Sequence, residues 1–129
     1  MRNIAALLLL AGYAVHSGPA GAQDAAAGEK VFAKCRACHQ VGPTAKNGVG
    51  PPLNGLIDRK SGSYEGYNYT AVNKDSGLTW DEATFSEYIE NPQAKLKGTK
   101  MVFPGLKKPE EVKDIIAFLK QYKADGSKK

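Results

Sequence analysis

The sequence predicts an all-α fold in which short helices are joined by long irregular loops. Three observations favour it: an apolar repeat of helical period near the C-terminus, capping residues and prolines at expected helix ends, and no alternating strand pattern of any length. At 129 residues the chain fits one domain, and it shows no internal repeats. We therefore expect a single helical domain.

The first helix is expected over residues 25–34, which are rich in alanine and free of proline. Asp24 stands at its start, where a carboxylate accepts hydrogen bonds from free backbone N–H groups. Residues 40–68 are instead rich in glycine and proline and keep neither apolar period. Irregular segments of this length are uncommon in compact domains unless they have a function or surround a bound group.

The middle of the chain favours two further helices. A short one is expected over residues 70–74. Thr79 and Glu82 then have the spacing of a capping box, which predicts a helix that continues to Glu90. This helix ends before Pro92, because proline disfavours helical geometry in the residue that precedes it.

The last helix has the clearest pattern. It begins at Pro109, with two glutamates in its positively polarised first turn. Its apolar residues recur at i, i+3, i+4 and i+7, as Val112, Ile115, Ile116 and Leu119. Residues 93–108 before it are expected to be irregular, and residues 126–129 are expected to fray.

The N-terminal segment resembles a secretory leader. Arg2 precedes an apolar run over residues 4–15, and small residues end at Ala20-Gly21-Ala22. We expect a signal peptide over residues 1–22 with cleavage before Gln23, and one domain over residues 23–129. The alternative is an uncut anchor, but spanning a bilayer takes roughly 18 or more apolar residues, and this run is shorter.

Removal of the leader leaves few residues able to carry site chemistry. Loss of Arg2 lowers the formal net charge from +5 to +4. One histidine, His39, one methionine, Met101, and two cysteines remain. This modest charge, with no basic cluster, argues against nucleic acid as a partner.

The two cysteines and the histidine form the sequence Cys35-Arg36-Ala37-Cys38-His39, the attachment signature of c-type haem. Two thiols at this spacing reach the two vinyl groups on one porphyrin edge, and the next residue is held over the iron as a ligand. A zinc site would need further Cys or His ligands, which the mature chain lacks. A thioredoxin-like dithiol would need a strand–helix–strand setting, which is also missing. We therefore predict one covalent haem c, with His39 as an axial ligand.

Met101 is the candidate for the second axial ligand. Met/His ligation raises the reduction potential and leaves no open position for substrate or oxygen, as an electron carrier requires. A lone methionine is otherwise commonly core filler. The alternative function is a ligand-binding or peroxidase-like haem protein in which Met101 is displaced easily.

Beyond the haem motif, the chain resembles the class I cytochromes c, and within them the bacterial cytochrome c2 group closest to mitochondrial cytochrome c. The resemblance extends from about Gly28 to Tyr122. Its motifs are Gly28 and Phe32, Cys35 to His39, Gly50-Pro51, Tyr69-Thr70, Gly77 to Trp80, Tyr88, Asn91-Pro92, Gly98 to Phe103, and Ile115 to Lys120. It implies the cytochrome c fold, with helices and long loops wrapped around one covalently bound haem.

The resemblance also implies roles for residues around the haem. The Pro51 carbonyl would accept a hydrogen bond from the His39 ring and fix its orientation. The donors to the inner haem propionate would be Tyr69, Trp80 and Arg59. The residues that set the polarity near Met101 would be Tyr88, Asn73 and Thr99. Phe103 would cover the haem edge, and Gly28 with Phe32 would pack against Ile115 and Phe118 where the first and last helices cross.

The function implied is that of a soluble periplasmic one-electron carrier, not an enzyme. It would be a monomer without stable membrane insertion, carrying electrons from a cytochrome bc complex to a photosynthetic reaction centre or a terminal oxidase. An alternative is a dedicated donor or acceptor for one periplasmic dehydrogenase. The lysines expected to dock on acidic surfaces of membrane redox complexes are Lys34, Lys46, Lys95, Lys97, Lys100, Lys107 and Lys108.

Overall fold

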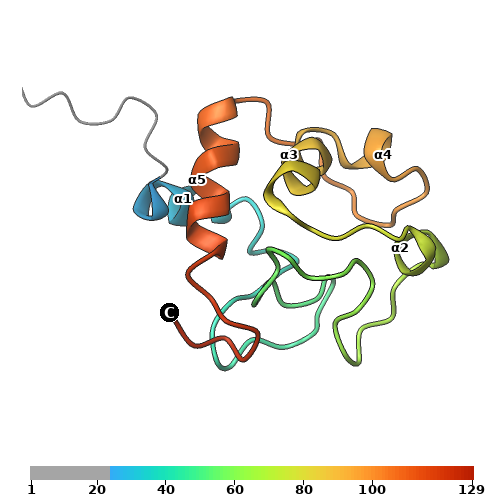
Figure 1. Ribbon diagram of the computed structural model, residues 1–129, viewed down its shortest axis with the longest axis horizontal. Coiled ribbons are helices and arrows are strands. Elements are labelled where there is room, and N and C mark those ends of the chain that lie inside the picture. Colours follow the sequence, from blue (N-terminus) through green and yellow to red (C-terminus); the bar gives the residue numbers. More distant parts are fainter. Residues whose placement is uncertain (1–23) are drawn as a thin grey trace, which may run out of the picture.

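The computed structural model describes residues 24–129, and within this range it is helical with no strand longer than an isolated bridge (Figure 1). The all-α prediction is confirmed. The helices are α1 (Ala25–Phe32), α2 (Ala71–Asp75), α3 (Glu82–Glu90), α4 (Pro92–Lys95) and α5 (Pro109–Leu119). No helix over residues 24–129 has the length and apolar character needed to cross a membrane. The predicted signal peptide lies outside the described residues.

The first and last helices cross in close contact (Figure 1). Gly28 permits this, because a Cβ at this position would lie 2.0 Å from the backbone oxygen of Asp114. Beside the crossing, the rings of Phe32 and Phe118 stack with centroids 5.1 Å apart. The apolar face predicted for α5 is buried, and Ile115 is only 1 % exposed. The crossing thus forms one wall of the core.

The helix boundaries differ from the expected ones in two places near α3. The predicted Thr79 capping box is wrong: Asp81 is the N-cap, and its carboxylate accepts from Thr84 N at 2.7 Å. Thr79 forms an antiparallel bridge with Lys60, which keeps this part of the chain extended. The prediction of an irregular segment from residue 93 is also wrong at its start, because α4 forms one helical turn capped by Asn91.

Smaller differences occur at the other helix ends. Helix α1 ends two residues earlier than expected, because the hydrogen bonds after it join residues three apart instead of four. Lys34 N bonds to Val31 O, and Cys35 N bonds to Phe32 O. Helix α2 is shifted by one residue, since Thr70 caps it from outside. The start of α5 at Pro109 is as predicted.

The C-terminal residues do not fray as expected but form a turn packed on the long loop (Figure 1). Lys123 N bonds to Ser127 O at 2.8 Å, which folds the chain back. Gly126 is buried so tightly that a Cβ there would lie 2.1 Å from Gly42 O. The buried Asn54 amide pairs with both backbone groups of Gly42, each at 2.8 Å. The chain end therefore supports the loop that leads to Pro51.

Asp58 is the one non-glycine residue with positive φ among residues 24–129, at 70°. Left-handed backbone costs an L-residue roughly 1–2 kcal/mol, less for Asp, and glycine avoids this cost. We expect Asp58→Gly to raise the free energy of unfolding by about 0.5 kcal/mol, after glycine's greater unfolded-state entropy is subtracted. Asp58→Ala should lower it by about 1 kcal/mol. Guanidinium unfolding of both variants measures this; equal stabilities would contradict the strain argument.

Candidate functional site

Helices α3 and α5 and the loops enclose one cavity of about 400 Å³, within the usual size range of ligand pockets. Its walls are largely apolar, with Leu56, Phe85, Ile115 and Leu119 among them. Every site residue predicted from the sequence lines this cavity. They are Cys35, Cys38, His39, Pro51, Arg59, Tyr69, Asn73, Trp80, Tyr88, Thr99, Met101 and Phe103.

The two cysteines lie on the tight turn that follows α1. Cys38 N and His39 N both bond to Cys35 O, at 3.1 and 2.9 Å, so the motif closes on itself. Burial, aided by the nearby Cys38, raises the pKa of Cys35 to about 11. Its thiol is therefore protonated at neutral pH, whereas dithiol redox chemistry depends on a thiolate. This disfavours the thioredoxin-like interpretation.

The His39 ring is fixed from two sides. Its Nδ1 lies 2.7 Å from the carbonyl oxygen of Pro51, the geometry in which Nδ1–H donates. Gly50 packs against the ring, since a Cβ there would lie 2.3 Å from His39 Cε1. Burial lowers the pKa of His39 below its ordinary value and so favours the neutral imidazole. With Nδ1–H engaged, Nε2 keeps the lone pair that a metal ligand needs.

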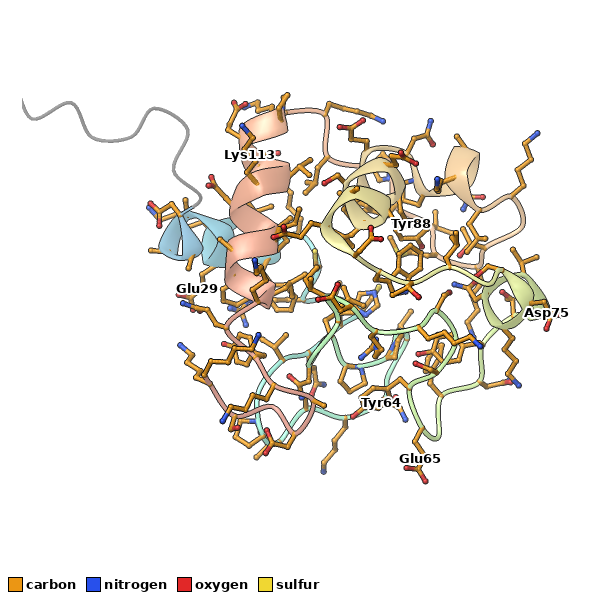
Figure 2. The ribbon with its side chains drawn as sticks, viewed as in Figure 1. Glu29, Tyr64, Glu65, Asp75, Tyr88 and Lys113 are labelled. Atoms are coloured by element: carbon orange, nitrogen blue, oxygen red, sulfur yellow. The ribbon has the colours of Figure 1, made fainter. Side chains whose placement is uncertain are left out.

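The thioether of Met101 is also held by a neighbour. The Tyr88 hydroxyl, which comes from α3 and points into the interior, donates to Met101 Sδ at 3.4 Å (Figure 2). Burial raises the pKa of Tyr88, so this hydroxyl keeps its proton. Thr99 Oγ1 lies 3.3 Å from Asn73 Oδ1, which also accepts from Thr70 at 2.8 Å. These polar groups form a network beside the methionine.

A second group of donors faces the cavity from the long loop and from the segment before α3. Arg59 donates to the carbonyls of Pro52 and Asn54, which uses only one of its terminal nitrogens. Trp80 is 7 % exposed and lines the cavity with an indole ring whose nitrogen is a hydrogen-bond donor. Such a donor in a buried ring ordinarily finds a partner. Hydrogen-bond donors beside an apolar cavity fit the carboxylates of a haem.

Two residues at or near the cavity, Tyr67 and Gln93, are not predicted as site residues from the sequence. Tyr67 lines it and donates to Val49 O at 2.6 Å, while Lys100 lies over the Tyr67 ring at 4.6 Å. The repeat of tyrosines at positions 64, 67 and 69 is the signal that could have found Tyr67. The amide of Gln93 bonds to the Met101 loop, but no sequence pattern around Gln93 indicates this role.

The donor set suits a haem better than a bare metal ion. Within residues 24–129 no three side chains of His, Cys, Asp or Glu gather as a metal site. Structural zinc takes four such ligands. One imidazole, one thioether and two thiols around an apolar cavity are the groups that attach and ligate a c-type haem.

The comparisons with known proteins agree with this site. Residues 25–123 match the family model described as cytochrome c. A cytochrome c2 of Blastochloris viridis is 59 % identical over 111 residues, 86 % of this chain and 87 % of that protein. A cytochrome c2 of Rhodoblastus acidophilus is 62 % identical over 107 residues, 83 % of this chain and 100 % of that protein. The solved structure of cytochrome cH from Methylobacterium extorquens has a TM-score of 0.71 and 52 % identity, covering 75 % of this chain and 97 % of that one. The chain therefore belongs to the cytochrome c family, as a class I c-type cytochrome of the bacterial cytochrome c2 group with covalently bound haem c.

Proposed function

We propose that this electron carrier is a soluble periplasmic protein that moves single electrons from a cytochrome bc complex to a photosynthetic reaction centre or a terminal oxidase. Residues 1–22 are proposed to be its cleaved signal peptide and residues 23–129 its haem domain. Cys35 and Cys38 would form the thioether bonds, and His39 and Met101 the two axial bonds. No substrate binds or reacts.

The observation that carries the proposal is that two candidate ligands reach one cavity and each is already oriented by a hydrogen bond. His39 is held by Pro51 at 2.7 Å and the Met101 sulfur by Tyr88 at 3.4 Å. When bound, the haem supplies an iron that alternates between the ferrous and ferric states. Because both ligands are fixed beforehand, little of the protein has to rearrange when the charge on the iron changes.

The remaining cavity residues control the surroundings of that iron. The donors of Arg59 and Trp80, which line the cavity, suit the propionates, because a buried carboxylate needs hydrogen bonds or a counter-charge. Phe85 and Leu119 help to exclude water. Val49 and Val102, which are 73 % and 95 % exposed, lie at the rim and offer an apolar surface to a partner.

The lysines proposed for docking differ in whether they form ion pairs with nearby carboxylates. Lys34 pairs with Glu111 at 2.9 Å, and Lys95 pairs with Glu87. The lysines that form no ion pair within residues 24–129 include Lys46, Lys97 and Lys108. We propose that these unpaired lysines dominate the attraction to acidic partner surfaces, since a paired charge is partly cancelled.

The proposal is tested by reaction with isolated partner complexes. We expect fast reduction by a cytochrome bc complex and fast oxidation by a reaction centre or an oxidase. Both rates should fall steeply as salt is raised from about 0.01 M to about 0.5 M, because the Debye length shrinks from roughly 30 Å to a few Å. Slow transfer that is indifferent to ionic strength would contradict the proposed partners, and rapid transfer with a periplasmic dehydrogenase alone would favour the dedicated donor or acceptor.

A further inference from the structure

The Gln93 side chain makes two hydrogen bonds to the backbone that carries Met101. Its Nε2 group donates to Met101 O at 2.8 Å and to Thr99 O at 3.2 Å. Both N–H groups of one amide therefore face two carbonyls of the same loop. Gln93 is itself exposed, so these bonds rather than core packing are what it contributes.

The Met101 loop has little else to hold its backbone. Over residues 100–105 no backbone group bonds to another backbone group in the described chain. Met101 N is 3.4 Å from Thr99 Oγ1, a long contact. Tyr88 reaches the sulfur and Lys100 bonds to Asn68 O, but neither holds the main chain of Met101. Gln93 alone among the described residues binds the Met101 carbonyl.

The base from which Gln93 reaches the loop is firmly placed. Helix α4 begins with buried Pro92, and the Asn91 side chain accepts from Ala94 N. Buried Leu96 follows the helix, and its carbonyl accepts from Thr99 N at 3.0 Å. A fixed helix turn thus presents an amide to an otherwise weakly bonded loop.

We propose that Gln93 is a positioning residue that keeps Met101 on the haem iron by holding its backbone. The inference rests on the proposed axial role of Met101. For the thioether to leave, the loop has to move, and movement breaks the two bonds to Gln93. Their loss should therefore speed the departure of Met101 without changing which residue is the ligand. Because Gln93 is exposed, each of its bonds contributes at the weak end of the range for hydrogen bonds, and we expect an effect of about tenfold for the pair.

The test uses the oxidised holoprotein with imidazole as the competing ligand. Gln93→Leu and Gln93→Glu both remove the two N–H donors, one without charge and one with it. Ala94→Glu is the matched control, because it places the same charge on the next exposed residue of α4. At saturating imidazole the binding rate reports the departure of Met101. The absorbance band of Met–iron ligation at the red end of the spectrum and guanidinium unfolding are measured alongside.

We expect both Gln93 variants to keep the red band and to bind imidazole about tenfold faster, while Ala94→Glu matches the wild type. Unchanged rates in both variants, even with lowered global stability, would overturn the inference. A faster rate in Gln93→Glu alone would also overturn it, because charge rather than the lost donors would then be the cause. Absence of the red band in the wild type would instead disprove the proposed ligation, so the two failures are distinguishable.

Discussion

Replacing Met101 with leucine is expected to remove the red absorbance band of the oxidised protein and to lower its reduction potential sharply. Leucine fills a similar volume but has no lone pair for the iron. Thioether ligation raises the potential, and axial ligands set haem potentials over roughly 0.8 V, so the fall should be a substantial part of that range. Spectroscopy and a redox titration measure both effects.

Val102→Ala is the control for the Met101 variant, because Val102 is the next residue and is 95 % exposed. It should leave the band and the potential as in the wild type. Met101→Leu should also bind cyanide or peroxide readily, since one axial position is open. If it kept the wild-type band and potential, Met101 would not be the ligand, and the carrier mechanism would need a different sixth ligand.

Replacing Gly28 with alanine is expected to cost about 2 kcal/mol of unfolding free energy. The new Cβ would lie 2.0 Å from Asp114 O and 2.7 Å from Phe118 Cβ, so α1 and α5 have to separate. Overpacking of this kind costs roughly 1–3 kcal/mol, and alanine's higher helix propensity offsets only part of it. Guanidinium unfolding followed by circular dichroism measures the loss.

Gly48→Ala is the matched control for the helix crossing. A Cβ there would have its nearest neighbour, Cys38 O, 4.0 Å away. Its stability should stay within about 0.5 kcal/mol of the wild type. A Gly28→Ala protein as stable as this control would show that the helices can separate at no cost.

The sequence allowed prediction of features whose signals are local. Cys35 to His39 are five consecutive residues, and the apolar period of α5 repeats within three turns. The resemblance to cytochromes c supplied the more distant cavity residues, such as Trp80, which spacing alone did not indicate. All of them line the cavity, while their individual roles stay predictions.

The errors arose where contacts distant in sequence decided the local structure. Thr79 and Asp81 both had capping chemistry, and the bridge from Thr79 to Lys60 determined that Asp81 caps α3. Residues 126–129 are polar in sequence and were predicted to fray, but Gly126 packs against Gly42. Gln93 is a surface glutamine by sequence, and only the path of the Met101 loop gives its amide two partners.

A purification tag fused directly after Lys129 would follow a turn that is packed against the long loop. Lys129 N bonds to Gln121 O at 2.9 Å, and the turn before it seats Gly126 on Gly42. Gly42 is in turn locked to Asn54 in the loop that delivers the Pro51 carbonyl to His39. A change that displaced this turn would therefore act on the support of the imidazole, so we expect material for redox measurements to behave most like the native protein when a flexible spacer or a cleavable tag is used.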